Sequence, residues 1–179
     1  DHDARLSSSE YKRFYNYDYK NDKTLDESDP NYKKYGYYEH ELNRSVPFFF
    51  WSKNDNQKIN KTITNVMGAY DILPTLGNMF GFYNKYALGS DIFNTNNDNT
   101  VIFPNGNYVT NKIYYNSQAD EAYDIEKKEV IAKELEPKEY ITKRTKETDQ
   151  KLNVSNDILV YNLLKKVGLK TNDELKVGK

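Results

Sequence analysis

Hydrophobic residues form a few short blocks in this chain, and long polar stretches separate the blocks. The longest unbroken block spans residues 46–51, between Ser45 and Ser52. A continuous apolar run of this length is typical of a strand buried on both faces, as in a parallel sheet covered by helices. Pro47 lies near its start, where a missing N–H is tolerated. The pattern therefore predicts a buried strand over residues 45–52.

Residues 71–80 have the spacing of an amphipathic helix. Asp71 is a favourable N-cap, and Pro74 lies in the first turn, where the absent N–H is not needed. Gly81 can end the helix in a left-handed conformation. Apolar residues three and four positions apart form one stripe, namely Ile72, Leu76, Met79 and Phe80. A strand, a loop and a packed helix in this order indicate an α/β fold.

Short β-prone runs follow at residues 100–103, 107–110 and 113–115. The first two are separated by Pro104-Asn105-Gly106, and Asn-Gly is a strong signal for a hairpin turn. A small antiparallel sheet is the simplest interpretation of this region.

Two polar segments flank these elements. Residues 118–152 are charged and helix-prone and are interrupted by Pro137, which predicts a solvated helix lying on the domain. Residues 13–41 mix tyrosine, lysine and acidic residues without a sustained period, which predicts a long surface excursion after a short serine-capped helix at Glu10. A tyrosine platform for glycans or lipid headgroups and an ordinary half-buried loop are both open interpretations of this excursion.

The tail carries a second amphipathic pattern. Residues 157–167 predict a helix that Ser155 or Asn156 caps and that Gly168 ends. Two lysines near its end give too little basic charge for attachment to a membrane surface. We therefore expect its apolar side chains to pack on the domain; they are Ile158, Leu159, Leu163 and Leu164.

Composition excludes several classes of function. The chain has 179 residues with 26 basic and 27 acidic side chains, a balance that argues against a nucleic-acid partner held by bulk charge. Without cysteine, disulfide frameworks, zinc–thiolate sites and cysteine nucleophiles are excluded. No apolar run approaches the roughly 18 residues of a membrane span, and no signal peptide is recognisable. The first residue is Asp1 rather than methionine, so the chain is interpreted as a piece of a longer protein.

Few residues offer catalytic chemistry. Asp1 and His2 could supply a carboxylate and an imidazole to one divalent cation, although such a pair can also merely cap a turn. His40 is the only other histidine, and it is a weak candidate for a site. No glycine-rich phosphate loop, HExxH or GxSxG motif is present, and no Ser/His/Asp set can be argued.

Several motifs, in their order and spacing, resemble one enzyme family. Asp1-His2, the apolar run 46–50 and the helix start Asp-Ile-Leu-Pro-Thr-Leu at 71–76 look like the C-terminal part of an alkaline-phosphatase-superfamily, sulfatase-type domain. Residues 86–93 and 101–110, together with the tail, narrow the resemblance to lipoteichoic acid synthases. These are polyglycerolphosphate transferases that act in cell-wall lipoteichoic acid synthesis. The resemblance covers roughly residues 1–6 and 45–166.

The resemblance implies the fold and the reaction. The expected fold class is α/β, the C-terminal portion of an alkaline-phosphatase-like (sulfatase) fold, with a small antiparallel sheet and C-terminal helices. The implied parent is a membrane-anchored transferase on the extracellular face of the cell membrane, whose divalent cofactor is Mn2+, with Mg2+ or Zn2+ possible. Its partners are phosphatidylglycerol and a glycerophosphate polymer. Asp1 and His2 match the family's adjacent Asp-His metal ligands.

Parts of the family's machinery have no recognised counterpart here. Neither the threonine nucleophile nor the substrate-binding residues can be matched, so the 179-residue chain alone is expected to be inactive. The predicted organisation is a portion of the catalytic domain at residues 1–117, with the Tyr/Lys-rich insertion at about 13–41, and a charged helical tail at residues 118–179. A sulfatase or phosphodiesterase of the same superfamily is the first alternative, and a non-catalytic glycan-binding surface module is the second.

Overall fold

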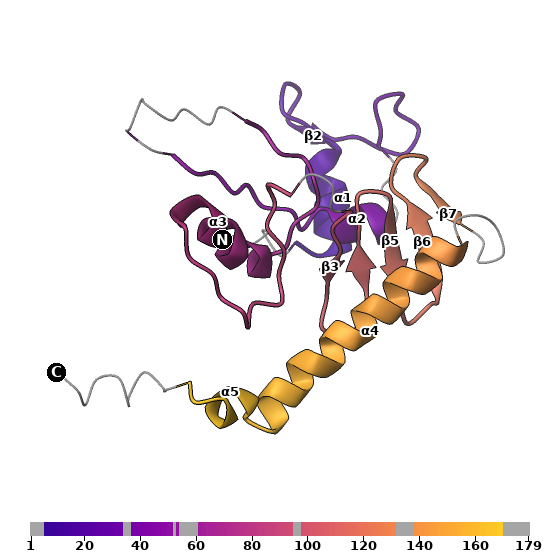
Figure 1. Cartoon of the computed structure of the whole chain (residues 1–179). Coiled ribbons are helices and arrows are strands. Elements are labelled where there is room, and N and C mark those ends of the chain that lie inside the picture. The colour runs from indigo at the N-terminus through magenta and orange to yellow at the C-terminus, as the bar shows by residue number, and fades with distance from the viewer. Residues whose placement is uncertain are drawn as a thin grey trace. The chain divides into compact units, whose positions relative to one another are not determined.

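A computed structural model describes residues 6–33, 37–51, 53, 61–94, 98–131 and 138–169. The chain divides into two compact units, Asp1–Lys61 and Thr62–Lys179, each with its own internal contacts (Figure 1). Both combine helices with antiparallel strands. The predicted α/β class, with a small antiparallel sheet and C-terminal helices, is therefore confirmed.

The second unit contains a five-stranded antiparallel meander. Its strands pair in sequence order, and they are β3 (Val101–Ile102), β4 (Tyr108–Val109), β5 (Ile113–Asn116), β6 (Glu121–Asp124) and β7 (Glu129–Ile131). The predicted Asn-Gly turn joins β3 to β4, and Gly106 has a φ of 86°, the left-handed geometry that glycine tolerates best. The three expected β runs are confirmed as β3, β4 and β5.

The last two strands replace the start of the predicted charged helix, so that part of the prediction is wrong. Tyr123 pairs with Tyr114, and Ala122 pairs with Tyr115, in an antiparallel register. Asp120 and Lys128 have positive φ values of 56° and 58° in the turns that reverse the chain. Burial of Ala122 and Tyr123 against the sheet overrides the helical propensity of the charged residues around them.

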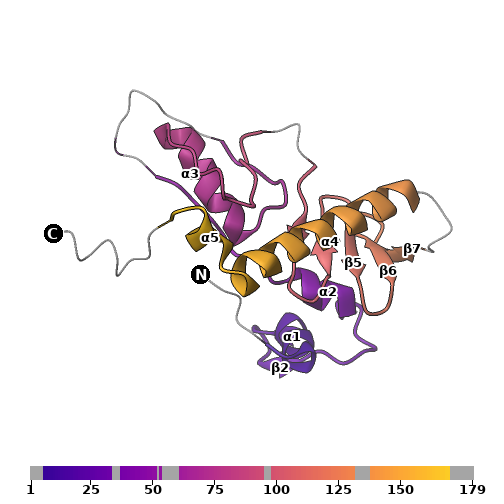
Figure 2. The same ribbon diagram turned by 60° about the horizontal axis from the view of Figure 1, so that its bottom comes forward.

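Helix α4 (Lys138–Val160) lies along one face of this sheet in both views (Figures 1 and 2). Ile141 of α4 enters the core, and the stacked rings of Tyr108 and Tyr115, with centroids 4.9 Å apart, form its centre. Ile113 and Ala122 complete the buried cluster. The sheet thus needs α4 for its apolar face, because a small meander by itself buries little surface.

The tail differs from the prediction in two ways. Helix α4 runs through Ser155 and Asn156 without a break, so neither residue caps a separate helix. After Asn162, with a φ of 48°, a short helix α5 (Leu163–Lys166) follows, and Gly168 ends it as predicted. The expected packing of the apolar tail residues is wrong for Leu159 and Leu164, whose side chains are exposed, while Ile158 and Leu163 are half-buried.

The predicted helix at residues 71–80 is present. A 3-10 turn, η2 (Ala69–Asp71), leads into α3 (Ile72–Phe80), and Gly81 adopts the left-handed conformation with a φ of 72°. Asp71 occupies the N-cap position of α3 as predicted, but its side chain makes no capping bond to that helix. Its carboxylate has other partners, which are described below.

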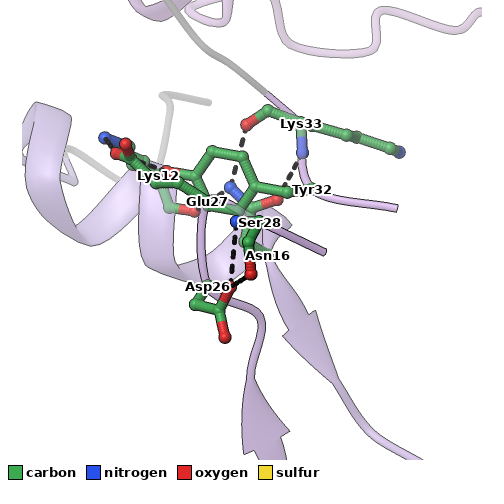
Figure 3. Close-up of polar contacts among 7 residues, drawn as sticks. All are labelled: Lys12, Asn16, Asp26, Glu27, Ser28, Tyr32 and Lys33. Atoms are coloured by element: carbon green, nitrogen blue, oxygen red, sulfur yellow. Dashed lines mark hydrogen bonds and ion pairs between the residues drawn. The ribbon is translucent and has the colours of Figure 1, made fainter. Parts of the chain in front are cut away.

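The first unit is small and combines polar contacts with the packing of rings around buried Tyr11. It comprises α1 (Ser8–Tyr15), β1 (Tyr17–Asp18), β2 (Lys23–Thr24) and α2 (Tyr37–Leu42). The predicted serine cap is confirmed: the Ser7 hydroxyl accepts a bond from the Glu10 amide, and the Glu10 carboxylate accepts one from the Ser7 amide. Buried Asn16 ties α1 to residue 33, because its amide donates to the Lys33 carbonyl at 2.9 Å and accepts from the Lys33 amide at 2.7 Å (Figure 3).

The predicted buried strand at residues 45–52 is wrong as far as the structure describes that segment. Residues 45–51 form no strand, and Phe49 and Trp51 are 83% and 79% exposed. A strand buried on both faces needs neighbours to pair with and helices to cover it. Within the described ranges, all strand pairs are antiparallel and none includes this run.

Candidate functional site

The carboxylate of Asp71 accepts three hydrogen bonds within the second unit. The residue is only 1% exposed, and its side chain accepts bonds from the amides of Gly68 at 2.8 Å and Ser90 at 2.7 Å. A third bond comes from Asn99 Nδ2 at 2.8 Å. These bonds satisfy a buried charge that would otherwise be costly, and they fix three separate segments around the start of α3.

Thr75, one helical turn after Asp71, also connects two segments of the chain. Its hydroxyl donates to the Asp71 carbonyl at 2.7 Å and accepts a bond from the Ile92 amide at 3.1 Å. Gly89 fits against the same turn, because a Cβ at that position would stand 2.1 Å from the Tyr70 carbonyl oxygen. The helix-start motif at residues 71–76 therefore has a structural role here: it anchors the loop that runs from Gly89 to residue 92.

Tyr70 connects the start of α3 to the sheet. Its hydroxyl donates to the Thr100 carbonyl at 3.0 Å and accepts from the Ile102 amide at 2.8 Å. Burial raises the pKa of Tyr70 to about 12, so the phenol stays neutral and keeps both bonds at physiological pH. These two bonds tie the start of α3 to β3 and to Thr100 just before it.

A polar cleft of about 330 Å³ opens between residues 98–102 and α4. Its lining combines hydroxyl, amide and charged side chains, namely Ser90, Asp98, Asn99, Thr100, Ile102, Arg144, Glu147 and Lys151. Arg144 joins the two sides: its guanidinium bonds Asp98 at 2.9 Å and Glu147 at 2.9 Å. The guanidinium of Arg144 also lies over the ring of Tyr140, with 5.1 Å between Cζ and the ring centroid. This cation–π contact further restrains the guanidinium.

Two polar atoms at this cleft lack partners among the described residues. Thr100 is 5% exposed, and its Oγ1 has no hydrogen bond; the same holds for the Nε of Arg144. Lys151 forms no ion pair within the described ranges. This cleft was not predictable from the sequence, because Asp98 lies 46 residues from Arg144. The one local signal is the helical spacing of Arg144, Glu147 and Lys151.

The predicted metal ligands, Asp1 and His2, lie outside the described residues. Within the part of the chain that the structure describes, no group of three or more His, Asp or Glu side chains is placed to hold a metal ion. The predicted metal centre therefore stays a prediction. The donor set itself, one carboxylate and one imidazole, suits Mn2+ and Zn2+ in its chemistry.

His40, the other histidine, takes part in the packing of the first unit. One ring nitrogen lies 2.9 Å from the Leu6 carbonyl oxygen, and the ring meets Tyr11 edge-on with centroids 5.6 Å apart. Its second nitrogen lies 3.8 Å from a carboxylate oxygen of Glu41. Both ring nitrogens thus face groups of the same unit, as in a structural histidine.

The first unit also has a cavity, of about 380 Å³. Aromatic rings and a guanidinium surround it, and the lining residues are Leu6, Glu10, Arg13, Phe14, Tyr17 and Tyr19. Tyr17 and Tyr19 are in edge-to-face contact with centroids 5.0 Å apart, and Tyr19 is 71% exposed. This surface combines apolar ring faces with hydrogen-bonding side chains.

In the described ranges, no helix is both long and apolar enough to cross a membrane. No protein-family model matches the chain. The sequence is nevertheless similar to lipoteichoic acid synthases, and this similarity confirms the recognition of a lipoteichoic-acid-synthase-like C-terminal domain.

Two relatives carry this result. The chain is 31% identical over 130 residues, 72% of its length, to lipoteichoic acid synthase 1 of Bacillus subtilis. It is 30% identical over 129 residues, 70% of its length, to lipoteichoic acid synthase of Staphylococcus saprophyticus. The matches cover 19% and 18% of those proteins, so the chain spans about one fifth of the length of the curated relatives it matches.

Proposed function

We propose that this chain is part of a metal-dependent phosphoglycerol transferase that acts on phosphatidylglycerol and extends a glycerophosphate polymer at the extracellular face of the cell membrane. The observation that carries the proposal is the similarity to two lipoteichoic acid synthases over about 70% of the chain. The family role is that of a transferase in lipoteichoic acid synthesis. The proposal adds three things to that family role, which are the substrate phosphatidylglycerol, a divalent metal and a location at the extracellular face of the membrane.

Asp1 and His2 would hold the divalent cation together with ligands that these 179 residues do not supply. A bound Mn2+ would lower the pKa of a nucleophilic hydroxyl and offset charge on phosphoryl oxygens. The Asp1 carboxylate would offset part of the cation's charge, and the neutral His2 imidazole would add a nitrogen ligand that transition metals favour.

The decisive experiment uses the intact parent enzyme with Asp1→Asn and His2→Gln. Metal content is measured by elemental analysis, and turnover is measured with phosphatidylglycerol. We expect both variants to lose most of the metal and most of the activity while their circular dichroism spectra stay unchanged. Full metal occupancy with normal turnover in both variants would refute the ligand assignment. Turnover of an aryl sulfate instead of phosphatidylglycerol would favour a sulfatase.

The pH dependence of metal binding gives a second measurement on the same site. The imidazole must be neutral to bind a cation, so metal affinity should fall as pH drops below about 6.5, the ordinary pKa of histidine. His2→Gln should remove this dependence from the residual binding. The isolated 179-residue chain should show no turnover on phosphatidylglycerol or aryl phosphodiesters, and metal-dependent turnover by that chain would refute the proposal that the nucleophile lies elsewhere.

A glycan-binding module is the second candidate, and the aromatic cavity of the first unit supports it. Phe14 and Tyr19 are exposed rings, and Arg13 and Glu10 can bond to hydroxyl groups beside them. Binding of the chain to a glycan array tests this second candidate function. Binding that Tyr19→Ala removes and Tyr83→Ala keeps would support the module, because Tyr83 is equally an exposed ring but does not line the cavity.

A further inference from the structure

The cavity of the first unit has an arginine in its wall. Arg13 belongs to α1, is exposed to solvent and therefore can be reached by a ligand. Its guanidinium carries five N–H donors. In the part of the chain that the structure describes, the Arg13 side chain forms no ion pair. The cavity thus has a positive charge that these residues of the protein do not offset.

Glu10 lines the same cavity but does not neutralise Arg13, although the two residues are one helical turn apart. One oxygen of the Glu10 carboxylate accepts hydrogen bonds from the Ser7 amide at 2.8 Å and from the Ser7 hydroxyl at 2.6 Å. These bonds lower the pKa of Glu10, so the carboxylate is ionised at neutral pH. Its second oxygen can accept hydrogen bonds from hydroxyl groups of a ligand.

Aromatic rings form the rest of the wall. Phe14 and Tyr19 are 55% and 71% exposed, so their faces are open to a ligand. The ring of Tyr17 is in edge-to-face contact with that of Tyr19, and the Tyr17 hydroxyl donates to Asp22, which restrains both rings. A pyranose ring has apolar C–H groups on its faces and hydroxyl groups around its rim. It therefore matches aromatic faces that lie beside hydrogen-bonding side chains.

Charge and volume restrict which sugar suits the cavity. A neutral sugar would leave the charge of Arg13 without a partner. A phosphate ester carries about −1.5 to −2 charges at pH 7, more than one guanidinium beside an ionised Glu10 can offset. A carboxylate carries one charge, and its two oxygens fit the guanidinium fork. The cavity volume of about 380 Å³ lies within the range for small-molecule sites, roughly 300–1,000 Å³.

We propose that this cavity binds a carboxylated sugar, such as a hexuronic acid unit of an acidic polysaccharide. The carboxylate binds Arg13, hydroxyl groups bind Glu10, and the sugar ring packs on Tyr19. This proposal rests on the second candidate function, the glycan-binding module, and narrows its ligand to acidic sugars. It does not depend on the proposed metal ligands Asp1 and His2.

The experiment compares two ligands that differ only in the group on C5 of the pyranose ring. Methyl β-D-glucuronide carries a carboxylate there, and methyl β-D-glucoside carries a neutral hydroxymethyl group. Each is titrated into the 179-residue chain and followed by NMR shifts of the aromatic ring protons. We expect a Kd on the order of 1 mM for the glucuronide, which is the affinity of a small, open site. The glucoside should bind at least about fivefold more weakly, because it lacks the charge-assisted bonds.

An arginine variant with a matched control locates the carboxylate. Arg13→Gln should raise the Kd of the glucuronide about fivefold, to the value of the glucoside, and should leave binding of the glucoside unchanged. Arg44→Gln removes the same charge from the same unit, but Arg44 pairs with Glu41 and does not line the cavity. This control should change both Kd values by less than about twofold.

Variants of Tyr19 test the ring contact. Tyr19→Ala should weaken binding of both ligands, because both use the ring face, whereas Tyr19→Phe should keep most of the binding. The side chain is 71% exposed, so neither change should lower Tm.

Three results would overturn the proposal, namely equal binding of the two sugars, equal effects of the two arginine variants, and binding of glucose 6-phosphate that is tighter than that of the glucuronide. Failure of the second candidate function is distinguishable. It would appear as no binding of any sugar, whereas binding of neutral sugars that needs Tyr19 but not Arg13 would keep the module and refute only its acidic ligand.

Discussion

Asn99 donates a hydrogen bond to Asp71 across 28 residues of sequence, with 2.8 Å between Nδ2 of Asn99 and Oδ2 of Asp71. Asn99 also donates to the Val66 carbonyl at 3.0 Å, so one side-chain amide bridges the segment before α3 and the segment before β3. Asp71 in turn holds the Ser90 amide. The position of the loop at the polar cleft therefore depends on these two residues.

Replacing Asp71 should destabilise the second unit strongly. Asp71→Ala would leave three donors without an acceptor, and each unsatisfied buried group costs about 1–3 kcal/mol. We expect a loss of roughly 3 kcal/mol or more in the free energy of unfolding, measured by urea denaturation. Asp91→Ala is the control, since Asp91 is an aspartate of the same loop that is less buried; a loss as large as that of Asp71→Ala would contradict the assigned role of Asp71.

Gly89 should not tolerate any side chain. A Cβ there would stand 2.1 Å from the Tyr70 carbonyl oxygen and 2.9 Å from the Asp71 Cα, both of them backbone atoms that cannot move aside easily. Gly89→Ala should therefore lower Tm by much more than Gly81→Ala, where the space is open and only the left-handed φ of 72° is strained, at a cost of about 1–2 kcal/mol. Equal losses in thermal scans of the two variants would show that the close approach is not rigid.

The sequence predicted those elements whose signals are local. The helix at α3 follows from its apolar stripe and from Gly81, and the hairpin between β3 and β4 follows from Asn105-Gly106. The role of Asp71 was not predictable, because its partners Ser90 and Asn99 are brought close only by the fold. A good helix cap and a buried anchoring carboxylate look alike in a single sequence.

The segments that the sequence predicted wrongly have one cause in common. Their conformation depends on residues that are distant in the sequence. β6 and β7 consist of residues with moderate helix propensity, and their strand conformation comes from pairing with β5. The apolar run at residues 46–51 has the composition of a buried strand, but no described strand pairs with it. The cleft was equally hidden, because Arg144 meets Asp98 only after α4 has packed on the sheet.

The stability of the second unit should depend on the buried core cluster and not on the apolar side chains of the tail. Ile141→Ala should cost about 2–5 kcal/mol, because Ile141 is 7% exposed and belongs to the core cluster. Leu163→Ala should cost less than about 2 kcal/mol, because that side chain is half-buried, and Leu159→Ala should be close to neutral. Chemical denaturation of the three variants measures the order, and a loss for Leu159→Ala as large as that for Ile141→Ala would place the tail in the core.

Stability should fall in alkaline solution because of Tyr108. The residue is fully buried, and its hydroxyl donates to the Ile141 carbonyl at 3.2 Å and lies 3.3 Å from Thr145 Oγ1. Burial raises the pKa of Tyr108 from its ordinary value of 10.0 to about 12. Between these two values the unfolded chain loses the phenolic proton while the folded chain keeps it, so the folded state binds more protons and stability decreases as pH rises.

The contribution of Tyr108 is thus fully present below about pH 10 and is lost as pH rises to about 12. Its size, from a shift of about two pKa units, is up to about 2–3 kcal/mol. Tyr108→Phe should cost about 1 kcal/mol at neutral pH through the lost hydrogen bond. It should also remove the Tyr108 share of the alkaline loss, while the share of Tyr70, whose pKa burial also raises to about 12, stays. Guanidinium denaturation of both proteins at about pH 9 and about pH 11 measures the difference, because the lysines titrate equally in both. Parallel loss of stability in the two proteins would show that another group, and not the Tyr108 hydroxyl, sets the alkaline limit.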